Sequence, residues 1–102
     1  MSESKTGTDG AVLHNSYFDG KVQSLGLETE KGRATLGVMK KGSYRFAAST
    51  PEQMVILSGK ANVTLADGGS LQFDGQGLFD VKADTAFDIA CETDVAYLCY
   101  YG

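Results

Sequence analysis

Residues 60–74 read KANVTLADGGSLQFD, and this stretch decides the class of fold. Polar and apolar residues alternate over Lys60–Leu65 and again over Leu71–Asp74, which is typical of strands that bury one face. The segment between them, Ala66–Ser70, contains a Gly-Gly pair that supplies the positive φ angles a tight hairpin requires. The stretch therefore predicts an antiparallel β-hairpin.

The same period of two continues on both sides of the hairpin. Downstream, a turn at Asp74–Gly77 precedes a short strand, Leu78–Val81, and a further strand places Phe87, Ile89 and Cys91 on one face. The other expected strands are Val95–Tyr100 and, upstream, Lys21–Leu27, Ala34–Met39, Tyr44–Ala47 and Met54–Leu57. Gly32, Gly42 and Gly59 are interpreted as breaks between the upstream strands. No stretch has helical periodicity beyond one turn. With 13 Gly and one Pro, this pattern indicates an antiparallel all-β sandwich or barrel.

Length and local composition indicate one domain. The chain has 102 residues, enough for one compact domain and too few for two. Residues 1–12 are rich in Ser, Thr, Gly and charge and are predicted to be a disordered lead-in, so the domain is expected over residues 13–102. No run approaches the roughly 18 apolar residues of a membrane span. Met1–Gly10 lacks the apolar segment of a secretory signal, so a cytoplasmic location is expected.

Charge and cysteine content exclude several classes of function. The net charge of −4 argues against duplex nucleic acid as a partner, because binding to the phosphate backbone needs a basic surface. Cys91 and Cys99 lie in apolar alternating stretches and are expected to be reduced thiols packed in the core. Two Cys and the single residue His14 are too few ligands for a zinc site.

A first family resemblance lies around Glu52–Gly59, a Glu followed by six residues and a Gly. This segment resembles the first cupin motif, in which a strand carries a metal-binding Glu. That motif also requires two His shortly before the Glu, and the corresponding positions fall among Arg45–Ala48. The second motif matches from Gly77 but reads Lys82-Ala83-Asp84 where Pro, Gly and His are expected. One remaining carboxylate does not hold a transition metal, so we expect a cupin scaffold without a bound metal.

A closer resemblance runs from Asn15 to Tyr101 in six ordered pieces. The chain is similar to the small metal-free cupins of the pyrimidine/purine nucleoside phosphorylase family. The pieces are Asn15–Leu25, Gly32–Met39 (GRATLGVM), Gly42–Phe46, Pro51–Met54, Ser58–Gly59 and Tyr97–Cys99. Lys82, Ala83 and Ser43 depart from the family pattern, which puts substrate preference in doubt more than fold.

The resemblance implies one cupin-type (RmlC-like jelly-roll) antiparallel β-barrel and an enzyme that transfers a pentosyl group. A purine or pyrimidine nucleoside and inorganic phosphate would give the free base and pentose 1-phosphate, with broad specificity. No cofactor is implied, because phosphate is the co-substrate and metal ligands are lacking.

Phosphorolysis needs an anion site and stabilisation of positive charge at the anomeric carbon. The chain has two Arg, and Arg is well suited to phosphate. Arg45 alternates with Tyr44 and Phe46, so it faces outward if they face inward. Arg33 is therefore the predicted phosphate ligand, with a solvated strand residue as the alternative. Glu52 shares a face with Met54 and Ile56 and is predicted to stabilise the ribosyl cation or bind ribose hydroxyls; the alternative is an ion pair with an Arg or a place at the open barrel end.

Aromatic residues supply candidates for binding the base. Tyr97 shares a face with Val95 and Cys99, and its ring or hydroxyl is predicted to contact base or phosphate. Phe46, Phe79 and Phe87 are predicted to form the apolar wall of the site. Ordinary core packing is the alternative for all four. His14, close to the lead-in, is expected to be a free side chain rather than a general acid.

Two other functions compete with the phosphorylase. A non-catalytic cupin module that binds a small sugar or nucleotide would explain the lack of an obvious general acid. A metal-dependent cupin enzyme would need ligands that the sequence does not show. Exposed edge strands in so small a barrel also predict a homodimer that pairs or exchanges strands.

Overall fold

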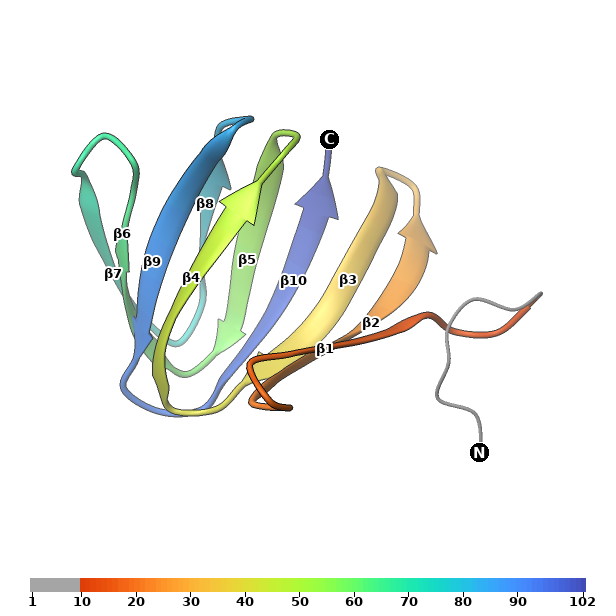
Figure 1. Ribbon diagram of the computed structural model, residues 1–102, viewed down its shortest axis with the longest axis horizontal. Coiled ribbons are helices and arrows are strands. Elements are labelled where there is room, and N and C mark those ends of the chain that lie inside the picture. Colours follow the sequence, from red (N-terminus) through yellow and green to blue (C-terminus); the bar gives the residue numbers. More distant parts are fainter. Residues whose placement is uncertain (1–9) are drawn as a thin grey trace.

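The computed structural model describes residues 10–102, which form ten β-strands and no helix (Figure 1). The strands are β1 (His14–Tyr17), β2 (Val22–Thr29), β3 (Gly32–Met39), β4 (Gly42–Ala48), β5 (Glu52–Ser58), β6 (Lys60–Thr64), β7 (Ser70–Asp74), β8 (Gly77–Val81), β9 (Thr85–Cys91) and β10 (Val95–Tyr101). Within these residues, no helix long and apolar enough to cross a membrane is found.

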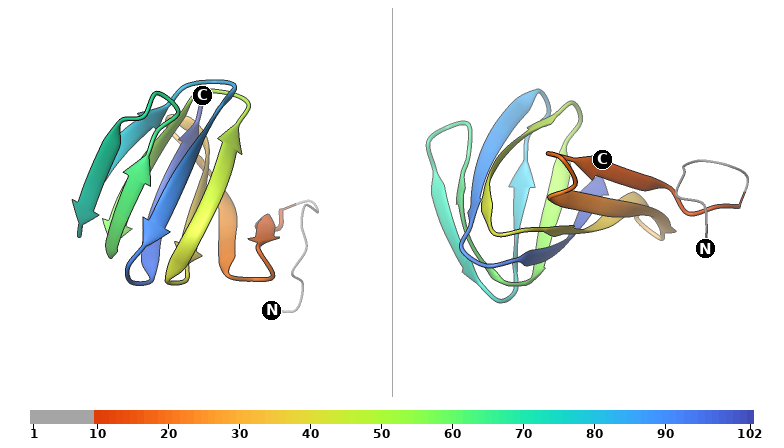
Figure 2. Two further views of the ribbon diagram at one scale, coloured as in Figure 1. Left: turned by 60° about the vertical axis from the view of Figure 1, so that its left-hand side comes forward. Right: turned by 60° about the horizontal axis from the view of Figure 1, so that its bottom comes forward.

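The strands belong to two antiparallel sheets. One sheet has six strands in the order β1-β2-β3-β10-β5-β8, and the other has four in the order β4-β9-β6-β7. Figure 2 shows the two sheets curving toward each other across a shared core. The prediction of an antiparallel all-β fold is confirmed. The sheets keep separate edges, at β1 and β8 and at β4 and β7, so closure into a single barrel stays a prediction.

The hairpin that decided the fold class is present as β6 and β7. Lys60 pairs with Asp74 and Thr64 with Ser70, and Gly68 in the turn has a φ of 92°. The other predicted strands are also present, mostly with wider bounds, although β2 begins at Val22 and not at Lys21. Gly32 and Gly42, expected to be breaks, are instead the first residues of β3 and β4. The short β1 had not been predicted as a strand of its own.

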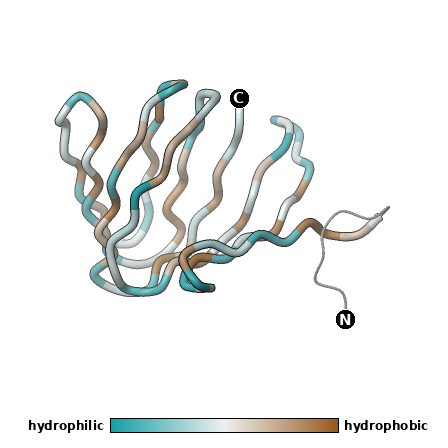
Figure 3. The backbone as a smooth tube through the Cα atoms, in the orientation of Figure 1, coloured by the Kyte–Doolittle hydropathy of each residue, from teal (hydrophilic) through white to brown (hydrophobic). Residues whose placement is uncertain are grey.

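Alternation along the strands builds the core, and Figure 3 shows apolar and polar positions following one another along the chain. Phe87, Ile89 and Cys91 of β9 are buried together, as their shared face predicted. Phe87 packs edge-on against Phe79, with ring centroids 5.4 Å apart, and Phe79 stacks at a tilt on Phe73 at 5.5 Å. Aromatic packing of this kind stabilises the junction between the two sheets.

The inner face of the six-stranded sheet changes character toward β2 and β3. Its buried residues there include the hydroxyls of Ser24 and Thr35, the only buried polar residues of the described chain. The facing sheet is two strands narrower, so it leaves part of this polar region uncovered. The mismatch in width places a cavity between the sheets.

Two further predictions concern the chain ends and the thiols. Residues 1–9 of the predicted lead-in lie outside the described residues, and residues 10–12 precede β1. Cys91 and Cys99 are both free and buried, which confirms that they pack as small apolar side chains.

Candidate functional site

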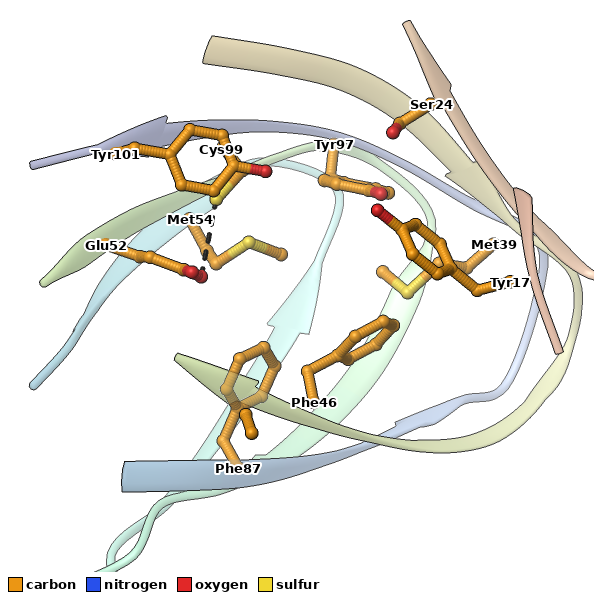
Figure 4. A pocket seen from close by; sticks show the side chains of 11 residues that line it. Tyr17, Ser24, Met39, Phe46, Glu52, Met54, Phe87, Tyr97, Cys99 and Tyr101 are labelled. Atoms are coloured by element: carbon orange, nitrogen blue, oxygen red, sulfur yellow. Dashed lines mark hydrogen bonds between the residues drawn. The ribbon is translucent and has the colours of Figure 1, made fainter. Parts of the chain in front are cut away.

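A cavity of about 270 Å³ lies between the two sheets (Figure 4). One side is apolar and the other carries hydroxyl groups and a carboxylate. The lining residues are Tyr17, Ser24, Met39, Phe46, Ala47, Glu52, Met54, Phe87, Tyr97, Cys99 and Tyr101. They come from seven strands, so the site exists only in the folded chain. Ligand pockets typically measure about 300–1,000 Å³, so this cavity suits a nucleobase-sized group with the rest of a ligand outside.

Glu52 begins β5 and lies half-buried at the cavity wall. The thiol of Cys99 donates to its Oε1 atom at 3.5 Å. Burial raises the pKa of the Glu52 carboxyl, and the hydrogen bond from Cys99 offsets part of that rise. Burial beside Glu52 also raises the pKa of the Cys99 thiol to about 12. At neutral pH Cys99 is therefore a hydrogen-bond donor and not a nucleophile.

Tyr97 lies on β10 directly opposite Gly37 of β3, which in turn pairs with Ser24 of β2. Its ring reaches across Gly37, and Tyr97 and Ser24 both line the cavity. Ser24 Oγ accepts a hydrogen bond from Asn15 Nδ2 at 3.2 Å. Burial is the main cause that raises the pKa of Tyr97, and Ser24 opposes it. Tyr97 therefore keeps its proton and can donate a hydrogen bond into the cavity.

Arg33 is exposed and lies outside the cavity, in an open groove at its mouth. The groove is lined by Arg33, Ala47, Ser49, Thr50, Glu52, Tyr101 and Gly102. It adjoins the cavity because Ala47, Glu52 and Tyr101 line both. The guanidinium carbon of Arg33 is 5.7 Å from the centre of the Tyr101 ring. The Tyr101 hydroxyl shares a hydrogen bond of 3.0 Å with Thr35 Oγ1, which fixes the ring.

The structure brings Arg33 and Glu52 to the same end of the sheet without joining them. Glu52 pairs with Tyr101 on β10, and Arg33 precedes Ala34, the partner of Tyr100 on the other side of β10. The ion pairs of residues 10–102 are Lys40 with Asp94 and Arg45 with Asp88, so the alternative of an Arg33–Glu52 ion pair is not found.

The remaining aromatic candidates separate into two groups. Phe46 and Phe87 line the cavity with ring centroids 5.6 Å apart. Phe79 is buried behind Phe87 and is absent from the cavity wall. Arg45 points outward and meets Asp88 at 3.7 Å, as its alternation with Tyr44 and Phe46 indicated. The prediction of a free His14 side chain is wrong, because His14 lies in β1 and shares a hydrogen bond of 2.9 Å with Gln23; it does not line the cavity.

Sequence reasoning missed three residues with hydroxyls at the site. Tyr101 shares a face with Tyr97, which alternation would have shown had the last strand been extended by one residue. Ser24 alternates with Val22 on the buried face of β2. Tyr17 ends the short β1, and no local pattern places its ring over the cavity.

The turn Lys82–Asp84 lies beside the mouth. Lys82 and Ala83 line a neighbouring hollow together with Glu52 and Tyr101. In residues 10–102, no three His, Cys, Asp or Glu side chains gather in a way that could hold a metal ion.

The two facing antiparallel sheets with a cavity between them have a cupin-like fold. A cupin from Shewanella frigidimarina superimposes with a TM-score of 0.70 at 14% identity, covering 95% of this chain and 88% of that one. A protein of unknown function from Vibrio parahaemolyticus superimposes with a TM-score of 0.82 at 31% identity, covering 88% of this chain and 97% of that one.

Within that class, the chain belongs to the pyrimidine/purine nucleoside phosphorylase family, whose sequence model matches residues 12–101. Relatives that carry this name include one from Alcanivorax borkumensis, 42% identical over 86% of this chain and 95% of its own length. Another, from Aeromonas hydrophila subsp. hydrophila, is 40% identical over 85% of this chain and 94% of its own length.

Proposed function

We propose that this protein is a nucleoside phosphorylase that acts on purine and pyrimidine nucleosides. The observation that carries the proposal is a cavity with one apolar wall whose mouth, at Glu52 and Tyr101, opens onto a groove containing Arg33. Membership of the family supports the same activity. A nucleoside that enters base first places its sugar at Glu52 and leaves the groove for phosphate.

The apolar part of the cavity is assigned to the base. Phe46 and Phe87 offer ring faces, and Met39 and Met54 are flexible side chains that adapt to different shapes. Ser24, Tyr97 and Tyr17 offer hydroxyls that can either donate or accept. No Asn or Gln lines the cavity, so no fixed donor–acceptor pattern selects one base. These features suit both purines and pyrimidines.

The groove at the mouth is assigned to phosphate. Arg33 supplies a planar fork of donors, and Ser49 and Thr50 supply hydroxyls in the same groove. The ring of Tyr101 lies beside the guanidinium of Arg33 and limits the directions in which it can point. Phosphate held there would approach the anomeric carbon from the side away from the base.

Glu52 is assigned to the charge that develops on the sugar. A phosphate oxygen forms a bond to the anomeric carbon while the bond from that carbon to the base nitrogen breaks, and the electron pair leaves with the base. The carboxylate of Glu52 stabilises the positive charge in between, because charge interactions are strong in a half-buried site. Tyr97 and Ser24, which keep their protons, hydrogen-bond to the departing base.

We also propose that the reaction uses no cofactor and that inorganic phosphate is the only co-substrate. Charge stabilisation is assigned entirely to Arg33 and Glu52. The positions at which the cupin motif carries its first two His fall among Arg45–Ala48 in this chain. Two free buried thiols, Cys91 and Cys99, suit a reducing compartment, and we propose a cytoplasmic location.

The test is base release from uridine, adenosine and guanosine, followed by chromatography with and without phosphate and a chelator. We expect release that requires phosphate, persists with the chelator and yields pentose 1-phosphate. No release above a heat-inactivated control with all three nucleosides would reject the proposal. Thermal stabilisation by a nucleoside that is recovered unchanged would instead indicate a binding module, and activity lost to the chelator would indicate a metal enzyme.

The homodimer is proposed to form through the outer face of the six-stranded sheet. A row of apolar side chains crosses five strands of that face in register. The row consists of Leu25, Leu36, Leu98, Val55 and Leu78. Three of them are 45–56% exposed, and contiguous exposed apolar patches mark interaction sites. A second copy related by a two-fold axis would present the same row to it.

A further inference from the structure

Gly37 has a structural reason to be glycine that comes from a neighbour and not from its own backbone. A Cβ atom at Gly37 would lie 2.5 Å from Cζ and Oη of Tyr97 and 2.6 Å from Cε1. Gly37 is not among the glycines with a positive φ, so another residue could adopt its backbone conformation. The ring of Tyr97 alone excludes a side chain at this position.

The absence of a side chain at Gly37 lets the Tyr97 ring lie flat against β3. The three residues Ser24, Gly37 and Tyr97 form one row across β2, β3 and β10, and the ring lies over the middle strand at Gly37. Figure 4 shows the Tyr97 ring along this wall of the cavity, with Ser24 beyond it. The backbone of β3 closes the space behind the ring.

A displaced Tyr97 ring therefore has one direction in which to move. A Cβ on the β3 side would push it away from the sheet and into the 270 Å³ cavity. The cavity would lose depth, and the hydroxyl would move away from Ser24. A two-ring base needs that depth more than a one-ring base does.

We propose that Gly37 is a positioning residue that sets the depth of the cavity through Tyr97 and thereby allows the site to accept purines as well as pyrimidines. This inference rests on the proposed function for its substrates and goes beyond it by assigning the breadth of base acceptance to one backbone position. The ring of Tyr97 is the contact with the base, and Gly37 acts only through it.

The experiment compares Gly37→Ala with Gly77→Ala in the full chain. Gly77 is a matched control, because its added Cβ would also lie 2.5 Å from an aromatic ring, that of Phe73, and neither residue lines the cavity. KM and kcat are measured for guanosine and uridine. Gly37→Ala should raise the KM for guanosine at least about tenfold more than the KM for uridine, the usual effect of one methyl-sized misfit. Gly77→Ala should lower Tm and leave the ratio of the two KM values unchanged.

Binding of free guanine and uracil, measured by calorimetry, separates this inference from the proposed function. A wild-type protein that binds both bases without turnover would reject the phosphorylase proposal, and selective loss of guanine binding in Gly37→Ala would still support the role of Gly37. If Gly37→Ala does not fold, the double variant Gly37→Ala/Tyr97→Leu removes the clash together with the Tyr97 contact, so it should bind both bases more weakly and show no selectivity against guanine. Equal losses for both bases in Gly37→Ala, or a double variant that is selective against guanine, would overturn the inference.

Discussion

Replacing Arg33 by Ala tests the proposed phosphate groove most directly. Arg33 is exposed and its guanidinium carbon lies 5.7 Å from the centre of the Tyr101 ring, so its removal should cost little stability. A cation–π contact at an exposed site contributes about 0.5–1 kcal/mol. For a domain of this size, such a loss lowers Tm by less than about 8 °C.

The expected effect on activity is larger. A hydrogen bond to a charged group contributes about 1.5–3 kcal/mol, and the open groove around Arg33 favours the lower part of that range. A loss of about 1.5–2 kcal/mol corresponds to roughly a 10- to 30-fold fall in kcat/KM for phosphate. The KM for the nucleoside should change much less, because the base binds in the cavity and not in the groove.

Arg45→Ala is the matched control, since it removes the same charge from the outer surface, where Arg45 meets Asp88 at 3.7 Å. Initial rates of base release are measured against phosphate concentration at fixed ionic strength. Arg45→Ala should leave the KM for phosphate unchanged. An Arg33→Ala protein with an unaltered phosphate dependence, or equal losses in the two variants, would refute the assignment of the groove.

Three further predictions follow from the site and the outer face. Glu52→Gln should lower kcat but raise Tm at pH 7–8 by a few degrees, because burial raises the pKa of Glu52 and its charged form destabilises the fold. The gain should disappear as pH falls below the Glu52 pKa, and a pH-independent difference in Tm would contradict this cause. Cys99→Ala should move the acid limb of the pH–rate profile to higher pH, because the thiol donates to Glu52 and lowers its pKa, whereas an unshifted limb would remove Cys99 from the site. Leu36→Glu should convert a dimer into a monomer of 10.8 kDa in light scattering, with Ser43→Glu on the other sheet as the control, and a wild-type monomer would reject the dimer.

The sequence alone predicted most of the strands because alternation is a local signal. Phe87, Ile89 and Cys91 share a buried face because side chains two residues apart on a strand point to the same side, which five consecutive residues are enough to show. The strand bounds were less accurate, because Gly32 and Gly42 were interpreted as breaks although both begin strands with a positive φ.

The site was predictable only in part because it depends on register between distant strands. Alternation correctly placed Glu52 on an inward face, but nothing local shows that Tyr101 lies between it and Arg33. Phe46 and Phe79 both lie within short alternating strands. Phe46 lines the cavity, whereas Phe79 packs behind Phe87. That difference comes from the unequal widths of the two sheets, which no single segment encodes.

The cavity opens at one end of the sheets, and this determines where a tag or reporter can be attached without blocking its mouth. Gly102 lines the groove beside Arg33, and its N–H donates to the carbonyl of Pro51 at 2.8 Å. A purification tag joined after Gly102 would therefore begin in the path of entering phosphate. The β7–β8 turn at Gly75 lies at the opposite end of the sheets in Figure 1, and nothing stands within 4 Å of a Cβ built there. A fluorescent reporter inserted at that turn should leave access to the cavity open.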